Sequence, residues 1–212
     1  MRIVSIIESG KRKKTVTLLT DTEEEVRVDG SFVSDHAIRE GLEVEDGLFA
    51  EWLNEWRRRK AMDAALRYLG YRSRTRSQME KYLNGKDFPA NTIAEVMEKL
   101  AGYGYLDDRR YAKEYMESKL KDRSLGRIRI RMALRERGIE DDIIEETLAG
   151  YDEDEELSQA VAYLEKQIHK LQGKSPEIRK KQCYAALARR GFNWETIQRA
   201  WNAVESKEED GT

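Results

Sequence analysis

The spacing of apolar residues divides the chain into a short first part and a long second part. In the first thirty residues, short runs rich in β-branched side chains alternate apolar with polar positions, as Val16 and Leu18 show. Alternation with a period of two is typical of a strand that is buried on one face. The pattern predicts a small antiparallel β meander, with strands at residues 2–7, 15–20 and 25–29.

Helical spacing begins soon after this meander. A short helix is expected near residues 34–40, and a long helix is expected from Asp46 to about Gly70. Phe49 and Leu53 are one helical turn apart on the long helix and belong to one apolar face. The long helix is therefore predicted to lead from the meander into the rest of the chain.

An apolar pattern then repeats three times, with steps of 4, 5, 5 and 4 residues in every copy. Each four-residue step marks one face of a helix, and the break between the two helices carries Gly138 or Gly191 in the later copies. The copies are offset by 51 and 53 residues. Their members are Met79, Leu83, Phe88, Ile93 and Met97; Ile130, Leu134, Ile139, Ile144 and Leu148; and Cys183, Leu187, Phe192, Ile197 and Trp201.

Another helical stretch lies upstream of each copy, so each copy predicts three helices. These upstream helices are expected at residues 60–69, 109–120 and 157–171. The predicted fold class is mainly α, with three tandem three-helix repeats preceded by a small N-terminal antiparallel β meander. The expected domains are the meander with its short helix (1–45), the long helix with the first repeat (46–106), the second repeat (107–151), the third repeat (152–205) and an acidic tail (206–212).

Composition narrows the class of protein. The chain has 212 residues, 38% of them charged, with a formal net charge of −2 and a single cysteine. No segment approaches the roughly 20 apolar residues of a membrane span, and the apolar run near the start has its charges on the wrong side for a signal peptide. One cysteine excludes an intramolecular disulfide and argues against a Cys/His zinc site. A cytoplasmic protein without a membrane segment is expected.

The near-neutral total hides a strong segregation of charge. Residues 57–137 contain 22 basic and 11 acidic residues, whereas residues 138–161 contain 10 acidic residues and no basic one. A solvated helical surface is one interpretation of such runs. Like charges one turn apart on a helix are mildly destabilising, however, so the basic cluster favours a polyanion or an acidic protein groove as partner. The predicted contact residues are Arg72, Arg74, Arg76, Lys119, Lys121, Arg123, Arg127, Arg131 and Arg135.

No candidate for catalysis survives inspection. Asp107 and Asp108 suit the start of a helix, where Asp107 caps the helix and Asp108 complements its positive end. Cys183 occupies a core slot of the repeat and is expected to be a small buried hydrophobe. His36 and His169 have no triad or metal spacing around them. The expected protein is no enzyme and uses no cofactor, metal or small-molecule substrate.

The second part of the chain contains the motifs Arg72-Ser73-Arg74, Gly104-Tyr105-Leu106-Asp107-Asp108, Gly126-Arg127 with Ile130, and Arg137-Gly138-Ile139. Together these motifs resemble the RecX family, which regulates the RecA recombinase. The resemblance covers about residues 57–205, and the N-terminal meander resembles the β-rich addition of extended members. It implies an elongated, curved array of three-helix units that binds along or at the end of RecA filaments on single-stranded DNA. Such binding limits filament growth and damps ATP hydrolysis and strand exchange. A monomer is expected.

Two other functions stay open from the residues alone. Tandem three-helix units also suit a direct DNA-binding protein built of helix-turn-helix-like units. A scaffold that binds only proteins is the second alternative. In every case the arginines are expected to position the partner electrostatically rather than to read bases.

Overall fold

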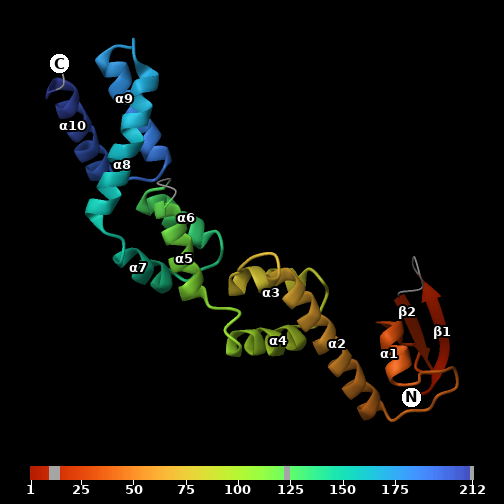
Figure 1. Cartoon of the computed structure of the whole chain (residues 1–212). Helices are drawn as coiled ribbons and strands as arrows, with labels where there is room; N and C mark the ends of the chain where they lie inside the picture. Colours follow the sequence, from red (N-terminus) through yellow and green to blue (C-terminus); the bar gives the residue numbers. More distant parts are fainter. Residues whose placement is uncertain (10–14, 122–124, 211–212) are drawn as a thin grey trace. The chain divides into compact units, whose positions relative to one another are not determined.

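The computed structural model describes residues 1–9, 15–121 and 125–210. They form two compact units, one of residues 1–70 and 82–99 and the other of residues 71–81 and 100–212. Figure 1 shows the order of the helices and strands along the chain. Among the described residues, no helix is both long and apolar enough to span a membrane.

The predicted β meander is confirmed and forms one wall of the first unit. Its strands are β1 (Ile3–Ser9), β2 (Thr15–Thr20) and β3 (Glu25–Asp29), in the antiparallel order β1-β2-β3. Val16 pairs with Val28 across β2 and β3, and both side chains are buried on one face. That face packs on Phe32 of α1 (Gly30–Asp35) and Phe49 of α2 (Asp46–Leu69).

The short helix lies earlier than residues 34–40, so that prediction was wrong in position. Asp29 accepts hydrogen bonds from the backbone N–H groups of Ser31 and Phe32 and thereby sets the start of α1 at Gly30. Ala37, with a φ of 48°, follows the end of the helix. A strand residue therefore caps the next element, which an apolar pattern does not reveal.

Asp29 also holds α2 against the sheet. Its carboxylate accepts a hydrogen bond from the Trp56 indole at 3.1 Å and pairs with the ammonium of Lys60. Burial by itself raises the pKa of Asp29, but the bonds from Lys60, Ser31, Trp56 and Phe32 outweigh it and hold that pKa well below its usual range. The first unit is thus tied together by an ionised aspartate.

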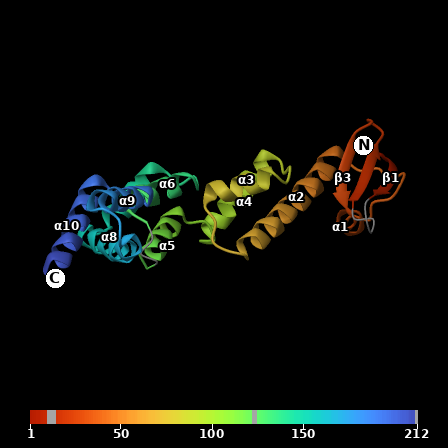
Figure 2. The same cartoon turned by 90° about the horizontal axis from the view of Figure 1, so that it is seen from above.

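The long helix and the three-helix repeats are confirmed. The upstream helix of each repeat is the end of α2, α5 (Asp108–Lys121) or α8 (Glu153–Ile168, followed by a 3-10 turn at His169–Leu171). In the last repeat, the three helices pack against one another (Figure 2). The other helices are α3 (Arg76–Asn84), α4 (Ala90–Gly102), α6 (Arg127–Arg135), α7 (Asp141–Ala149), α9 (Pro176–Arg189) and α10 (Trp194–Asp210).

The repeated apolar positions form the cores. In the second repeat they pack on Ala112 and Met116 of α5, and in the third on Ala160 and Leu164 of α8. Cys183 is fully buried, as its slot in the repeat predicted. In the first copy Phe88 is half-buried and the other four members are buried. The spacing of the sequence repeat therefore corresponds to a repeated core.

We predict that Leu83→Ala, Leu134→Ala and Leu187→Ala each lower the free energy of unfolding by about 2–5 kcal/mol. All three leucines have an exposed fraction of 0% in equivalent slots, so each substitution leaves a cavity. Urea denaturation measures the change. Ile178→Ala, on the surface of α9 at 47% exposure, is the matched control and should stay within about 0.5 kcal/mol of wild type. Three core variants as stable as this control would refute the repeat alignment.

We also predict a pH dependence that Asp29→Asn removes in part. The pKa of Asp29 is lower in the folded than in the unfolded chain, so its contribution to stability is complete above the unfolded value, about pH 4. That contribution is lost as pH falls through the folded value. Wild type should therefore lose more stability than the variant between neutral pH and about pH 3, measured by urea denaturation. Parallel curves would contradict the ionic role of Asp29.

Candidate partner-binding surface

Successive repeats in the second unit are joined by the same contact. The start of the second helix of one repeat lies on the turn between the second and third helices of the next. The Thr75 hydroxyl, just before α3, donates to the carbonyl of Arg137 at 2.6 Å. At the next joint the N–H of Gly126, just before α6, donates to the carbonyl of Arg190 at 2.9 Å. Arg137 and Arg190 hold equivalent positions, so the joint repeats with the sequence.

A glycine in each turn makes the joint possible. Gly138 and Gly191 have φ values of 76° and 84°, which L side chains rarely adopt. A Cβ added to Gly138 would overlap Ser77, and one added to Gly191 would overlap the backbone of Arg129. Both glycines, predicted only as helix ends, are therefore also points of close approach between repeats.

Buried carboxylates complete the two joints. Asp108 accepts the backbone N–H of Arg76 at the start of α3, with 2.9 Å between nitrogen and oxygen. Glu156 accepts the backbone N–H of Arg127 at the start of α6 in the same way, at 2.8 Å. Burial raises the pKa of the Asp108 carboxyl, although its bond to Arg76 opposes the shift. Asp107 caps α5 through the N–H of Arg110 as predicted, whereas Asp108 also caps a helix of the preceding repeat.

The predicted stripe of Arg127, Arg131 and Arg135 lies on α6, but each of the three arginines has an acidic partner. Arg131 forms two hydrogen bonds to Glu145 of α7 at 2.8 and 2.9 Å, and Arg135 donates to Asp141 at 2.6 Å. The acidic stretch of the sequence therefore faces the basic stripe. These acidic partners offset the repulsion among the three arginines. The fold itself therefore explains why three like charges stand on one face of α6.

Arg127 differs from the other two arginines because its acidic partner is buried. Its Nε lies 3.5 Å from a carboxylate oxygen of Glu156, whose side chain is only 2% exposed. Its Nη2 donates to the carbonyl of Tyr151 at 2.7 Å, and its guanidinium lies 5.5 Å from the centroid of the Tyr151 ring. Removing one partner of a buried ion pair is strongly destabilising, so Arg127 acts mainly within the joint.

The structure places the remaining candidates at two other locations. Arg72 and Arg76 are exposed just before and at the start of α3, and Arg74 between them is half-buried. Lys119 is half-buried on α5, with its ammonium 5.5 Å from the ring centroid of Tyr115. Lys121 is the last residue of α5, and Arg123 lies outside the described residues. The nine candidates thus do not form one continuous patch on one helix.

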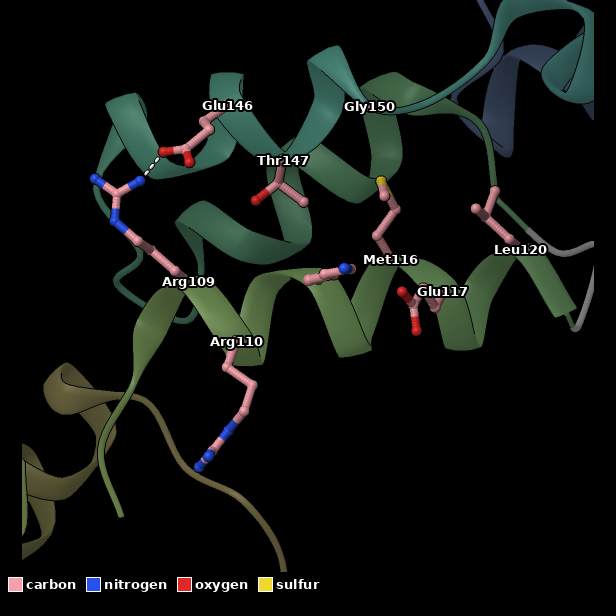
Figure 3. A pocket seen from close by; sticks show the side chains of 9 residues that line it. Arg109, Arg110, Met116, Glu117, Leu120, Glu146, Thr147 and Gly150 are labelled. Atoms are coloured by element: carbon pink, nitrogen blue, oxygen red, sulfur yellow. Dashed lines mark ion pairs between the residues drawn. The ribbon is translucent and has the colours of Figure 1, made fainter. Parts of the chain in front are cut away.

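A pocket of about 630 Å³ between α5 and α7 escaped the sequence analysis. Figure 3 shows Arg109 reaching from α5 toward Glu146 of α7, with which it forms an ion pair, while Arg110 points to the other side of α5. The sequence did contain a sign of this pocket, because basic and apolar side chains share one face of the helix predicted at residues 109–120. The lining residues are Arg109, Arg110, Lys113, Met116, Glu117, Leu120, Glu146, Thr147 and Gly150.

The arrangement offers binding surfaces rather than reactive groups. Within the part of the chain that the structure describes, no three His, Cys, Asp or Glu side chains gather as a metal site would need. Several acidic side chains of the second unit instead cap helices, as Asp107 and Asp108 do, or pair with arginines, as Glu145 does. The chemistry on offer is the binding of anionic or mixed apolar and charged partners.

Comparison with known proteins assigns all three repeats to one family. The RecX first, second and third three-helix domains match residues 61–100, 107–148 and 153–201. The chain is 29% identical to regulatory protein RecX of Bacillus pumilus, over 98% of this chain and 80% of that protein. It is 34% identical to that of Chlorobaculum tepidum, over 74% of this chain and 95% of that protein.

The fold has a solved counterpart as well. A crystal structure of regulatory protein RecX aligns with a TM-score of 0.68 at 24% sequence identity. The alignment covers 95% of this chain and 98% of that one. This likeness concerns the fold, and it extends beyond the three repeats to the N-terminal part.

We predict that Gly138→Ala and Gly191→Ala destabilise the chain more than Gly104→Ala does. All three glycines have positive φ, but a Cβ at Gly104 would meet no atom within 4 Å. Gly104→Ala therefore isolates the conformational cost, about 1–2 kcal/mol. The overlap at the joints should add about 1–3 kcal/mol, most at Gly191, where the obstacle is backbone. Urea denaturation measures the free energy of unfolding of all three variants. Equal losses of stability would show that close approach between the repeats does not require glycine.

Proposed function

Because this chain belongs to the RecX family of regulatory proteins, we propose that it regulates the RecA recombinase and is itself no enzyme. In this proposal it binds RecA filaments on single-stranded DNA and inhibits filament extension, ATP hydrolysis and strand exchange. The observation that carries the proposal is the match of all three three-helix domains, in order, to the family. A cytoplasmic monomer without a cofactor is part of the same proposal.

Electrostatics support a nucleoprotein filament as the partner. Such a filament presents a dense row of DNA phosphates, and residues 57–137 hold 22 basic against 11 acidic residues. Attraction between these charges acts over about 10 Å at 0.1 M salt and steers association. The basic half of the chain thus suits binding to a polyanionic surface.

Arg131 and Arg135 are the members of the stripe that can change partners. Their ion pairs with Glu145 and Asp141 join exposed carboxylates, and such pairs are worth only about 0–1 kcal/mol. Exchanging these carboxylates for a phosphate or an acidic side chain of the filament therefore costs little. Arg127 stays bound to Glu156 and positions α6. We propose Arg131 and Arg135, with exposed Arg72 and Arg76, as the contact residues.

We predict that Arg131→Ala combined with Arg135→Ala weakens inhibition of RecA's ATP hydrolysis on single-stranded DNA. The loss should be about tenfold for each arginine that contacts the filament. Wild-type inhibition should also fade as salt rises, because exposed charges are screened. The fold should persist in this variant, since Arg127 and its buried partner are untouched.

The matched control removes the acidic partners instead. Glu145→Gln with Asp141→Asn frees the same two arginines and should strengthen inhibition by up to about fivefold. Equal weakening by both double variants would assign the arginines a structural role only. A wild-type chain that leaves RecA's ATP hydrolysis unchanged would overturn the proposed function, and binding to duplex DNA in its place would favour the helix-turn-helix alternative.

A further inference from the structure

Three tyrosines stand exposed on two turns of the second unit. Tyr71 is 86% exposed just before α3, and Tyr103 and Tyr105 are 70% and 53% exposed between α4 and α5. A large aromatic ring in water forgoes the stabilisation that burial provides. Three such rings on neighbouring turns therefore indicate a surface with a use outside the fold.

The helices that follow the two turns are joined by a hydrogen bond. The Asp108 carboxylate at the start of α5 accepts the N–H of Arg76 at the start of α3. In the second turn, the N–H of Tyr105 donates to the carbonyl of Leu100 at 2.9 Å. The rings of Tyr103 and Tyr105 lie edge to face, with 6.3 Å between centroids, and both remain more than half exposed. The ordered backbone of this turn therefore holds Tyr103 and Tyr105 in place before any partner binds.

Arginines lie on the same two segments of the chain as these tyrosines. Arg110 donates from Nη2 to the carbonyl of Gly104, between the two tyrosines, at 2.8 Å. Arg110 also lies 3.8 Å from a carboxylate oxygen of Glu114. Arg72 in the first turn and Arg76 at the start of α3 are exposed. Positive charge and open aromatic faces thus occur on the same two turns.

The turn between α7 and α8 provides a contrast within the molecule. Its tyrosine, Tyr151, is only 3% exposed and packs under the guanidinium of Arg127, which Glu156 neutralises. In this fold, an arginine and a tyrosine can therefore be buried together, with the arginine paired to an acidic side chain. At the turns that carry Tyr71, Tyr103 and Tyr105, the rings are exposed instead, and the acidic partner of Arg110, Glu114, is itself exposed.

We propose that this surface binds single-stranded nucleic acid directly, without RecA. Unpaired bases stack on Tyr103, Tyr105 and Tyr71, while Arg72, Arg76 and Arg110 meet the phosphates. Stacking on aromatic side chains combined with a basic track is the general means of binding single strands. A duplex hides its base faces, and an acidic peptide would leave the rings without partners. The proposal goes beyond the proposed function because it requires no filament.

Fluorescence anisotropy of a labelled oligothymidylate with the full chain tests this inference. Tyr103→Ala and Tyr105→Ala should each weaken binding about fivefold or more, whereas Tyr→Phe at the same positions keeps the ring and should change affinity less than about twofold. Trp194→Ala, an exposed aromatic at the start of α10, is the matched control and should bind like wild type. Arg72→Ala with Arg76→Ala should lower the slope of log affinity against log salt by about 1.4.

An abasic strand with the same phosphates separates stacking from charge. It should bind the wild type more weakly than oligothymidylate does, and oligouridylate should resemble oligothymidylate. Equal affinity for the abasic strand, or alanine variants that bind like wild type, would overturn the inference. So would tyrosine variants that keep oligonucleotide affinity but lose inhibition of RecA, since the surface would then meet protein. That last result would leave the proposed function standing.

Discussion

The close approach of a helix start to a glycine turn of the next repeat is the contact that the second unit depends on. Between the second and third repeats it is a backbone contact, since the N–H of Gly126 donates to the carbonyl of Arg190 and that of Ile128 to the carbonyl of Gly191. Side chains cannot be placed between the two segments without a shift. Buried Glu156 satisfies a helix N–H at the same place, so packing and hydrogen bonding together fix the repeat-to-repeat geometry.

That joint also decides which charges are available to a partner. It brings the acidic start of α8 to the basic start of α6, so Arg127 is used inside the molecule. Arg131 and Arg135 pair with acids of α7 near the surface, where such pairs exchange readily. Arg72 and Arg76 remain exposed on the turn before α3. A segregated charge pattern in the sequence thus becomes a mixture of structural pairs and contact groups.

Asp87 of the first repeat shows why the later repeats carry glycine at the same turn position. It holds the turn position in the first copy that Gly138 and Gly191 hold later, and it too has a positive φ, 59°. Positive φ alone therefore does not demand glycine in this turn. The later copies carry glycine because the preceding repeat's helix approaches there, at Ser77 and at Arg129. The sequence predicted a turn at this position. The need for glycine there comes from the packing of one repeat against the next.

The sequence by itself determined the strands, the long helix, the three-helix repeat and its buried slots, because these follow from periodicity and capping between near neighbours. Leu83, Leu134, Leu187 and Cys183 were found in this way. Only the tertiary structure decided the partners of the α6 arginines and the second helix that Asp108 caps. Each of these depends on groups from another element, such as Glu156 for Arg127 or Asp108 for Arg76. Local patterns carry no information about such partners, because chain folding brings them together.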